Sequence, residues 1–123
     1  MTKTMGYLSP LVSIVIRTKN EERWIDHCLS AIATQSIRDF EIILVDNNSE
    51  DISVKIAKKY TDKIINVADF YPGKAINEGI RASSGKYIVI ISGHCIPKNN
   101  LWLEKLIDPL LKDESHLLAG VYG

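Results

Sequence analysis

The amino-acid sequence predicts an α/β fold in which a largely parallel sheet carries helices on both faces. Four short apolar runs are rich in Ile and Val and mostly lack polar alternation, a pattern typical of strands buried on both faces. Segments with helical periodicity alternate with these runs, so we expect each connection to be a right-handed crossover. The apolar runs are residues 12–16, 41–45, 63–67 and 87–91.

The connections between these runs predict helices. Residues 21–34 carry apolar pairs every four residues, and Asn20 is placed to serve as the N-cap of this helix. The same stripe places Trp24 in the core rather than against a ligand. Residues 54–60 and 73–83 carry shorter apolar stripes and also predict helices.

The segment after the fourth run predicts a further helix and a last strand. Residues 101–111 form an amphipathic pattern, in which Trp102 lies on the apolar side and is expected in the core. Because proline removes a backbone donor, we expect Pro109 to kink or divide this helix, with Asp108 capping a second piece. The apolar residues 117–122 predict a fifth strand.

The composition is that of one globular domain. The chain has 123 residues, of which 46% are hydrophobic and 24% are charged, enough for a single core and unlike a disordered chain or a disulfide scaffold. Fifteen Lys and Arg residues offset fifteen Asp and Glu residues, which disfavours binding to nucleic acid or to an anionic membrane.

The sequence contains no signal that would export or insert the chain. Residues 1–10 lack the apolar core of a signal peptide, and no run approaches the roughly 18 apolar residues of a membrane span. Cys28 and Cys95 form no Cys-x-x-Cys pair, which argues against a zinc knuckle or a redox site. We therefore expect a cytoplasmic protein. Cys95 is expected to point into the core beside Ile96.

Polar residues follow three of the predicted strands, at the sheet edge where open α/β folds bind ligands. They are residues 17–21, 46–49 and 92–95, which bring cations, amides, a carboxylate and an imidazole to one edge. The sequence has neither a Gly-x-Gly-x-x-Gly loop nor a P-loop. Glu21 and Glu22 would oppose an anion at the start of the first helix, so a phosphate is expected elsewhere, near a Lys or Arg side chain or a metal ion.

Five segments resemble the inverting glycosyltransferases of family two, in the right order and spacing. They are residues 12–21, 40–49, 77–80, 84–88 and 102–106. The resemblance covers about residues 11–122 and implies the GT-A fold, which is Rossmann-like. It implies that residues 1–10 are an N-terminal extension and that residues 11–123 are the nucleotide-sugar-binding part of a glycosyltransferase domain.

The resemblance also implies which residues bind the donor. The loop Arg17, Thr18, Lys19, Asn20 and Glu21 and the turn Asp46 and Asn47 would hold the base and ribose of a sugar nucleotide. Asn47 replaces the second Asp that family members often carry in this turn, so no preference for uridine follows. Lys74 is the candidate for the diphosphate, with Arg81 as a second cation, because the family's Ala-Arg-Asn segment reads Ala-Ile-Asn at residues 75–77.

The largest departure from the family follows the fourth strand. Family members usually carry an Asp-x-Asp motif that binds a divalent metal ion bridging the diphosphate, whereas this chain has Ser92, Gly93 and His94. Two hypotheses stay open. His94 could bind Mn²⁺, or Mg²⁺ less readily, together with diphosphate oxygens, or it could donate a hydrogen bond to the diphosphate without any metal.

The function implied is transfer of a sugar, with inversion, from a nucleoside-diphosphate sugar to an acceptor hydroxyl in cell-envelope polysaccharide assembly. The acceptor would be a saccharide or lipid-linked molecule, and the full-length enzyme a peripheral protein of the inner membrane face. The family's catalytic base lies in a second half, so we expect the 123 residues alone to be a truncated, inactive donor-binding part. Exposed apolar surface would then favour a homodimer. The alternatives are a non-catalytic nucleotide-binding module and a sugar nucleotidyltransferase.

Overall fold

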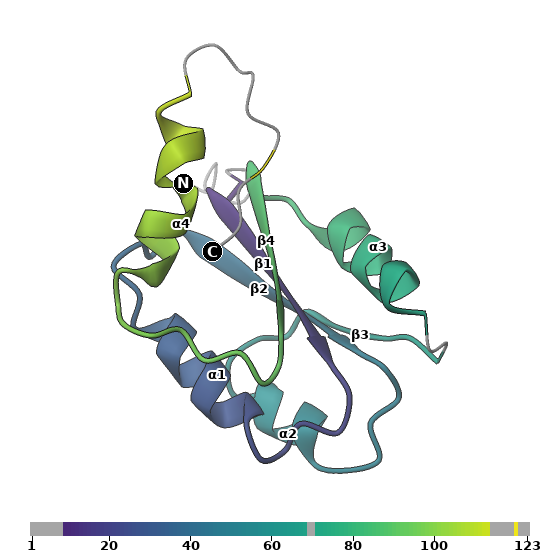
Figure 1. Cartoon of the computed structure of the whole chain (residues 1–123). Helices are drawn as coiled ribbons and strands as arrows, with labels where there is room; N and C mark the ends of the chain where they lie inside the picture. Colours follow the sequence, from purple (N-terminus) through teal and green to yellow (C-terminus); the bar gives the residue numbers. More distant parts are fainter. Residues whose placement is uncertain (1–8, 69–70, 114–119, 121–123) are drawn as a thin grey trace, which may run out of the picture.

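The computed structural model describes residues 9–68, 71–113 and 120, and its centre is a four-stranded sheet (Figure 1). All three strand pairings are parallel and the strand order is β3-β2-β1-β4. This confirms the predicted parallel sheet and its four strands. The strands are β1 (Val12–Thr18), β2 (Phe40–Asp46), β3 (Ile64–Asn66) and β4 (Tyr87–Ser92). The fifth strand predicted at residues 117–122 falls outside the described residues, apart from Gly120.

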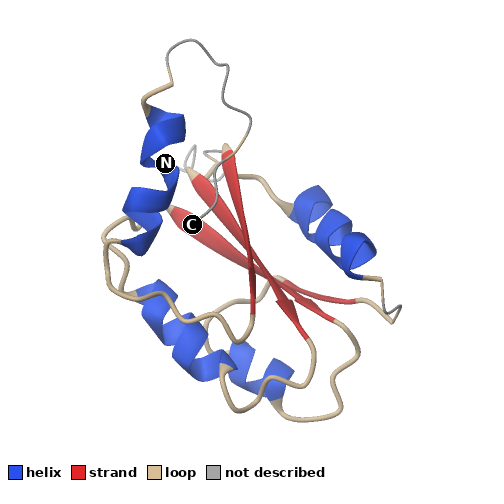
Figure 2. Cartoon of the chain, viewed as in Figure 1, coloured by secondary structure: helices blue, strands red, loops and turns tan. Residues whose placement is uncertain are grey.

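Helices cover both faces of the sheet, as predicted (Figure 2). One face carries α1, α2 and α4, and the other carries α3. The helices are α1 (Ile25–Ala33), α2 (Ser53–Ala57), α3 (Pro72–Ala82) and α4 (Trp102–Leu111). Among the described residues, no helix combines the length and the apolar character needed to cross a membrane.

The alternation of side chains along β1 divides the core into two layers. Ile14 and Ile16 pack with α1 and α4 in the larger layer, whereas Val15 packs with α3 in the smaller one. Each fully buried Ile or Val contributes about 1.5–3 kcal/mol. A Cβ on Gly79 of α3 would lie 2.4 Å from Cγ1 of Val15, so glycine allows this helix to lie close to the central strand.

The start of α1 differs from the prediction. The helix begins at Ile25, and Trp24 occupies the cap position without a side-chain hydrogen bond. Asn20 is therefore not the N-cap. A turn precedes the helix, in which the carbonyl of Glu21 accepts hydrogen bonds from the backbone N–H groups of Trp24 and Ile25. Because Trp24 precedes the buried stripe, it is 39% exposed, and the guanidinium of Arg23 lies 5.0 Å from its ring centroid.

The fourth helix is one continuous segment, so the prediction that Pro109 divides it was wrong. The helix ends two residues after Pro109, at Leu111. Asp108 caps no second piece, since its carbonyl accepts a hydrogen bond from the backbone N–H of Lys112 and its carboxylate pairs with Lys112 Nζ at 3.0 Å. Trp102 packs against the larger core layer, as predicted.

The two cysteines have different surroundings. Cys28 is buried in α1, and burial raises the pKa of its thiol to about 12. Cys95 is exposed, contrary to the expectation that it points into the core. The physical reason is its place in the turn after β4, where its backbone N–H donates to the carbonyl of Ser92.

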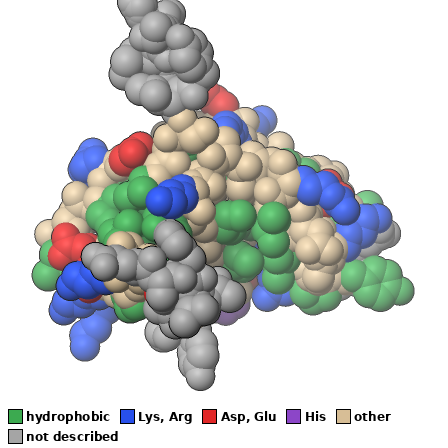
Figure 3. Space-filling view, turned by 90° about the horizontal axis from the view of Figure 1, so that it is seen from above, with side chains coloured by type: hydrophobic (Ala, Val, Ile, Leu, Met, Phe, Trp, Pro, Cys, Tyr) green, Lys and Arg blue, Asp and Glu red, His purple; other side chains and the backbone are tan. Residues whose placement is uncertain are grey.

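The molecular face seen from above in Figure 3 has mixed side chains. Lys and Arg side chains lie scattered over it among hydrophobic and other polar ones, which is consistent with the zero formal net charge of the chain.

Glu41 joins three segments at the amino end of the sheet. Its carboxylate accepts hydrogen bonds from Ser13 Oγ at 2.5 Å and from the backbone N–H of Ser84 at 2.7 Å, and it forms an ion pair with Lys63. Burial by itself would raise the pKa of Glu41, but the hydrogen bonds from Lys63, Ser13 and Ser84 outweigh it and lower the pKa from 4.5 to about 2.

We predict that Glu41→Gln lowers the free energy of unfolding by about 2 kcal/mol near neutral pH, because it weakens hydrogen bonds to a charged group. The folded-state pKa lies below the unfolded value, so the contribution is fully present above about pH 4.5 and is lost as the pH falls towards 2. Urea unfolding at several pH values measures it. Glu50→Gln, at an exposed position, is the control. An equal pH dependence in wild type and Glu41→Gln would contradict the prediction.

Candidate functional site

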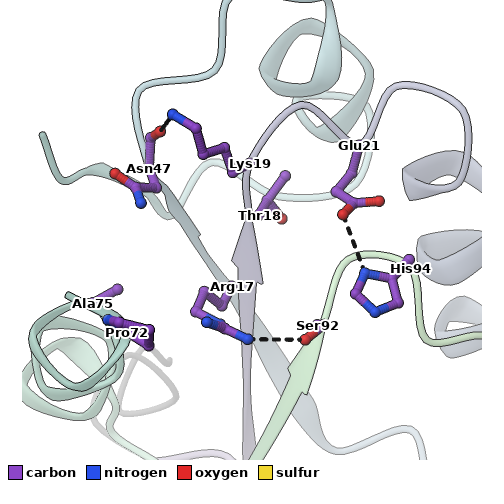
Figure 4. Close-up of a pocket in the computed structure, with 9 residues that line it drawn as sticks. All are labelled: Arg17, Thr18, Lys19, Glu21, Asn47, Pro72, Ala75, Ser92 and His94. Atoms are coloured by element: carbon purple, nitrogen blue, oxygen red, sulfur yellow. Dashed lines mark hydrogen bonds and ion pairs between the residues drawn. The ribbon is translucent and has the colours of Figure 1, made fainter. Parts of the chain in front are cut away.

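A pocket of about 280 Å³ lies where the carboxyl ends of β1, β2 and β4 meet the first turn of α3 (Figure 4). This is the sheet edge at which the sequence predicted a polar site. The pocket is lined by Arg17, Thr18, Lys19, Glu21, Asn47, Pro72, Ala75, Ser92 and His94. The predicted site residues that do not line it are Asn20, Asp46, Lys74 and Gly93.

The strand register brings the polar residues together. Arg17 lies opposite Ser92 on β4, and Thr18 lies opposite Asp46 on β2. Arg17 Nη2 donates to Ser92 Oγ at 3.4 Å, a long hydrogen bond that spans the ends of two strands. Since side chains alternate along β1, Arg17 shares the sheet face of Val15, which is the face that α3 covers.

Asn20 and Asp46 build the loops that surround the pocket. The Asp46 carboxylate accepts hydrogen bonds from the backbone N–H and the hydroxyl of Ser49, at 2.8 and 2.5 Å. Asn20 Oδ1 accepts from the backbone N–H of Glu50 at 2.8 Å, and its own N–H donates to Ser49 Oγ at 2.8 Å. Asn20 and Asn48 both have positive φ angles, 50° and 54°, which asparagine tolerates better than most residues.

The backbone of Glu21 is anchored to the start of α2. Its N–H donates to Ser53 Oγ at 2.7 Å, and the N–H of Glu22 donates to Asp51 Oδ2 at 3.0 Å. Burial would raise the pKa of Asp51, but hydrogen bonds from Ser53 and from the backbone of Glu22 lower it. The loop after β1 is therefore held from both sides, by the loop after β2 and by α2.

Glu21 and His94 meet across the pocket mouth. His94 Nδ1 lies 3.1 Å from Glu21 Oε1, a distance at which the ring N–H donates to the carboxylate. The side chain of Glu21 is 20% exposed and that of His94 is 58% exposed. Figure 4 shows the second ring nitrogen of His94 turned away from Glu21. The pair leaves that nitrogen available to a ligand.

Positive charge predominates in the pocket. Arg17 and Lys19 are cations, Glu21 is the one carboxylate among the lining residues, and His94 adds charge when it is protonated. Lys19 Nζ donates to the carbonyl of Asn47 at 3.2 Å, which holds it on the β2 side. This balance suits an anionic ligand.

The two cations predicted on α3 lie outside the pocket lining. Lys74 is exposed in the first turn, between the lining residues Pro72 and Ala75. Arg81 lies in the last turn, and its guanidinium donates to Glu78 at 2.6 Å. Sequence motifs gave no sign that Pro72 and Ala75 line the pocket, although a helix that follows β3 must begin at this edge of the sheet.

Thr18 and Gly93 form a tight contact beneath the pocket. Thr18 is 1% exposed, and within the described parts of the chain its hydroxyl is the buried side-chain polar atom left without a hydrogen-bond partner. A Cβ on Gly93 would lie 2.9 Å from Thr18 Oγ1 and 3.1 Å from Ile25 Cδ1. Glycine at position 93 therefore keeps the space beside this hydroxyl open.

The carboxylates near the pocket have partners within the protein. Glu21 accepts a hydrogen bond from His94, and Asp46 accepts two from Ser49. Within residues 9–68 and 71–113, no group of three or more His, Cys, Asp or Glu side chains is arranged to hold a metal ion.

We predict that Thr18→Val raises the free energy of unfolding by about 1 kcal/mol, because it removes a buried hydroxyl that lacks a partner and keeps the shape of the side chain. Thr18→Ser is the matched control. It keeps the hydroxyl, removes a methyl group and should lower the free energy of unfolding by about 1 kcal/mol. Chemical denaturation measures both, and destabilisation by Thr18→Val would show that the hydroxyl has a partner in solution.

Known proteins resemble this chain over most of its length. Glycosyltransferase AglE of Haloferax volcanii is 31% identical over 98% of this chain, which corresponds to 40% of AglE. S. aureus TarS, solved in complex with UDP-GlcNAc, is 25% identical and superimposes with a TM-score of 0.70 over 80% of this chain and 31% of the solved TarS chain. The chain therefore spans less than half the length of these relatives.

A third protein shares the fold and holds a metal ion. Mannosyltransferase PcManGT from Pyrobaculum calidifontis, solved with GDP-Man and Mn²⁺, superimposes with a TM-score of 0.77 at 19% identity, over 87% of this chain and 34% of that protein. The pocket of this chain does not offer the ligands that such an ion prefers. Hard divalent ions take carboxylate oxygens, whereas Glu21 is bonded to His94 and the Ser92 hydroxyl contacts Arg17.

The family model for "Glycosyl transferase family 2" matches residues 13–123. The sheet order, the helices on both faces and the superposition on solved glycosyltransferases agree with the GT-A fold expected from the resemblance. The chain belongs to glycosyl transferase family 2.

Proposed function

We propose that this chain binds the nucleoside diphosphate of a sugar donor in the pocket, as the donor-binding part of an inverting glycosyltransferase. The observation that carries the proposal is the meeting of Arg17, Lys19 and His94 at the carboxyl ends of the strands, in a pocket with one carboxylate. Support comes from TarS, a relative solved with UDP-GlcNAc.

Five of the residues that line the pocket have a role in this proposal. Arg17, at the end of β1, and protonated His94, in the turn after β4, bind the diphosphate through charge-assisted hydrogen bonds. Lys19 and Asn47, on the β2 side, contact the ribose and base. Thr18 supplies a hydroxyl at the floor.

The other predicted residues support the site or extend it. Asn20, Asp46 and Gly93 shape its loops and floor through the contacts described above. Lys74, exposed beside the pocket on α3, is placed to meet the sugar or the distal phosphate.

The proposed reaction is a direct displacement. An acceptor hydroxyl attacks the anomeric carbon, the bond to the diphosphate breaks, and the leaving group carries away the electron pair. Negative charge develops on the diphosphate, so cations fixed around it lower the barrier. The base that takes the proton of the acceptor is proposed to lie in a further part of the enzyme, so these 123 residues should bind donor with little turnover.

We propose a saccharide or lipid-linked acceptor in cell-envelope polysaccharide assembly. The cytoplasmic location with peripheral membrane association stays a prediction. A non-catalytic nucleotide-binding module would bind the same nucleotide. Transfer of sugar by a longer form of the enzyme would distinguish a glycosyltransferase from such a module. A sugar nucleotidyltransferase gains no support from the family match.

Association of two copies is also a proposal. Ile88 and Ile90 are 41% and 44% exposed on β4, while Val89 between them is buried. Apolar side chains on one side of a strand that borders the described sheet favour association.

The donor-binding proposal predicts saturable binding of one of UDP, GDP, dTDP or CDP, measured by isothermal titration calorimetry in a buffer that contains Mn²⁺. Arg17→Gln should weaken that binding by about tenfold or more, or about 1.4 kcal/mol, because the guanidinium is lost from the pocket. Lys58→Gln, which removes one exposed positive charge outside the pocket, should bind as wild type. Binding that is unaffected by Arg17→Gln would place the nucleotide elsewhere.

A further inference from the structure

We infer that the pocket binds the diphosphate through its own side chains, without a divalent metal ion. This inference rests on the proposed function and adds to it the way in which the phosphate charge is neutralised. It departs from the solved mannosyltransferase that holds Mn²⁺.

Arg17 lies beside Ser92 at the end of β4. Its guanidinium lies 3.4 Å from the hydroxyl of Ser92, so a fixed positive charge sits at the end of β4. A divalent ion held by Ser92 or His94 would lie beside that charge and be repelled by it, whereas a diphosphate placed there is attracted.

Few groups around His94 could serve as further metal ligands. Ser92 and His94 offer one hydroxyl and one imidazole, and Glu21 is already bonded to the imidazole at 3.1 Å. A carboxylate behind a histidine also occurs in metal sites, but there the metal has further protein ligands. The other charged residues that line the pocket are Arg17 and Lys19, which donate hydrogen bonds and accept none.

Several hydrogen-bond donors line the pocket. Arg17, Lys19 and His94 line the pocket and come from different places on its edge (Figure 4). Thr18 has a buried hydroxyl without a partner in the described residues, and it lines the same pocket. These groups match the oxygen atoms of a diphosphate, each of which accepts hydrogen bonds.

The test compares nucleotide binding with and without metal. UDP, GDP, dTDP and CDP are titrated into the 123-residue chain by calorimetry, once in EDTA and once in Mn²⁺. The dissociation constant of the nucleotide that binds should differ by less than about threefold between the two buffers. Binding that requires Mn²⁺, or that tightens by tenfold or more in its presence, would overturn the inference and leave the proposed function standing.

A double variant supplies the matched comparison. Ser92→Asp with His94→Asp restores two carboxylates at the end of β4, so it should bind the nucleotide weakly in EDTA and at least tenfold more tightly in Mn²⁺. Circular dichroism checks that it folds. Lys58→Gln should show the wild-type insensitivity to metal. If the double variant folds and is no more sensitive to Mn²⁺ than wild type, the choice of residues at positions 92 and 94 does not decide metal use, and the inference fails.

Mn²⁺ alone gives a readout that does not depend on nucleotide. Electron paramagnetic resonance of Mn²⁺ with the wild-type chain should show the free-ion signal undiminished. If the wild-type chain reduces the free-ion signal and the His94→Asn variant does not, the inference is overturned. If no nucleotide binds in either buffer, the proposed function is overturned, and the inference with it.

Discussion

The hydrogen bonds between the loops after β1 and β2 hold the pocket in shape. Asn20 is hydrogen-bonded to Ser49 and Glu50, and the carboxylate of Asp46 accepts a hydrogen bond from the backbone N–H of Ser49. These bonds fix loops that would otherwise lose conformational entropy on binding a ligand. The loops lose this conformational entropy when the chain folds. Arg17 and Lys19 therefore already line the pocket before a ligand binds.

The polar residues at this edge of the sheet have two different roles. Asn20 and Asp46 hydrogen-bond to the loop after β2, whereas Arg17, Lys19 and His94 line the pocket. A chain with no formal net charge thus concentrates positive charge at one sheet edge. Local charge near low-dielectric walls, rather than net charge, decides which ligand a cleft attracts.

The sequence was sufficient to predict the parallel sheet, the presence of helices on both of its faces and the edge that carries the pocket. Ile- and Val-rich runs and the rule that ligands bind at the carboxyl ends of parallel strands carried those predictions. The sequence did not predict where α1 begins, so Asn20 was wrongly expected to cap it and Trp24 to be buried. The turn before α1 is held by hydrogen bonds to residues about thirty positions further along the chain. Pro72 and Ala75 line the pocket because α3 packs against the sheet with its first turn at this edge. No local sequence pattern predicts how a helix packs.

The central claim is that the cations at the ends of β1 and β4 form an anion site, and nuclear magnetic resonance tests it residue by residue. Backbone amide signals of the ¹⁵N-labelled chain are followed while the nucleoside diphosphate that binds is added. The account predicts shifts that concentrate at Thr18, Lys19, Asn47 and Gly93, with Glu41 at the opposite end of the sheet unchanged. Shifts that concentrate away from the pocket, on α4 or at the amino end of the sheet, would contradict it.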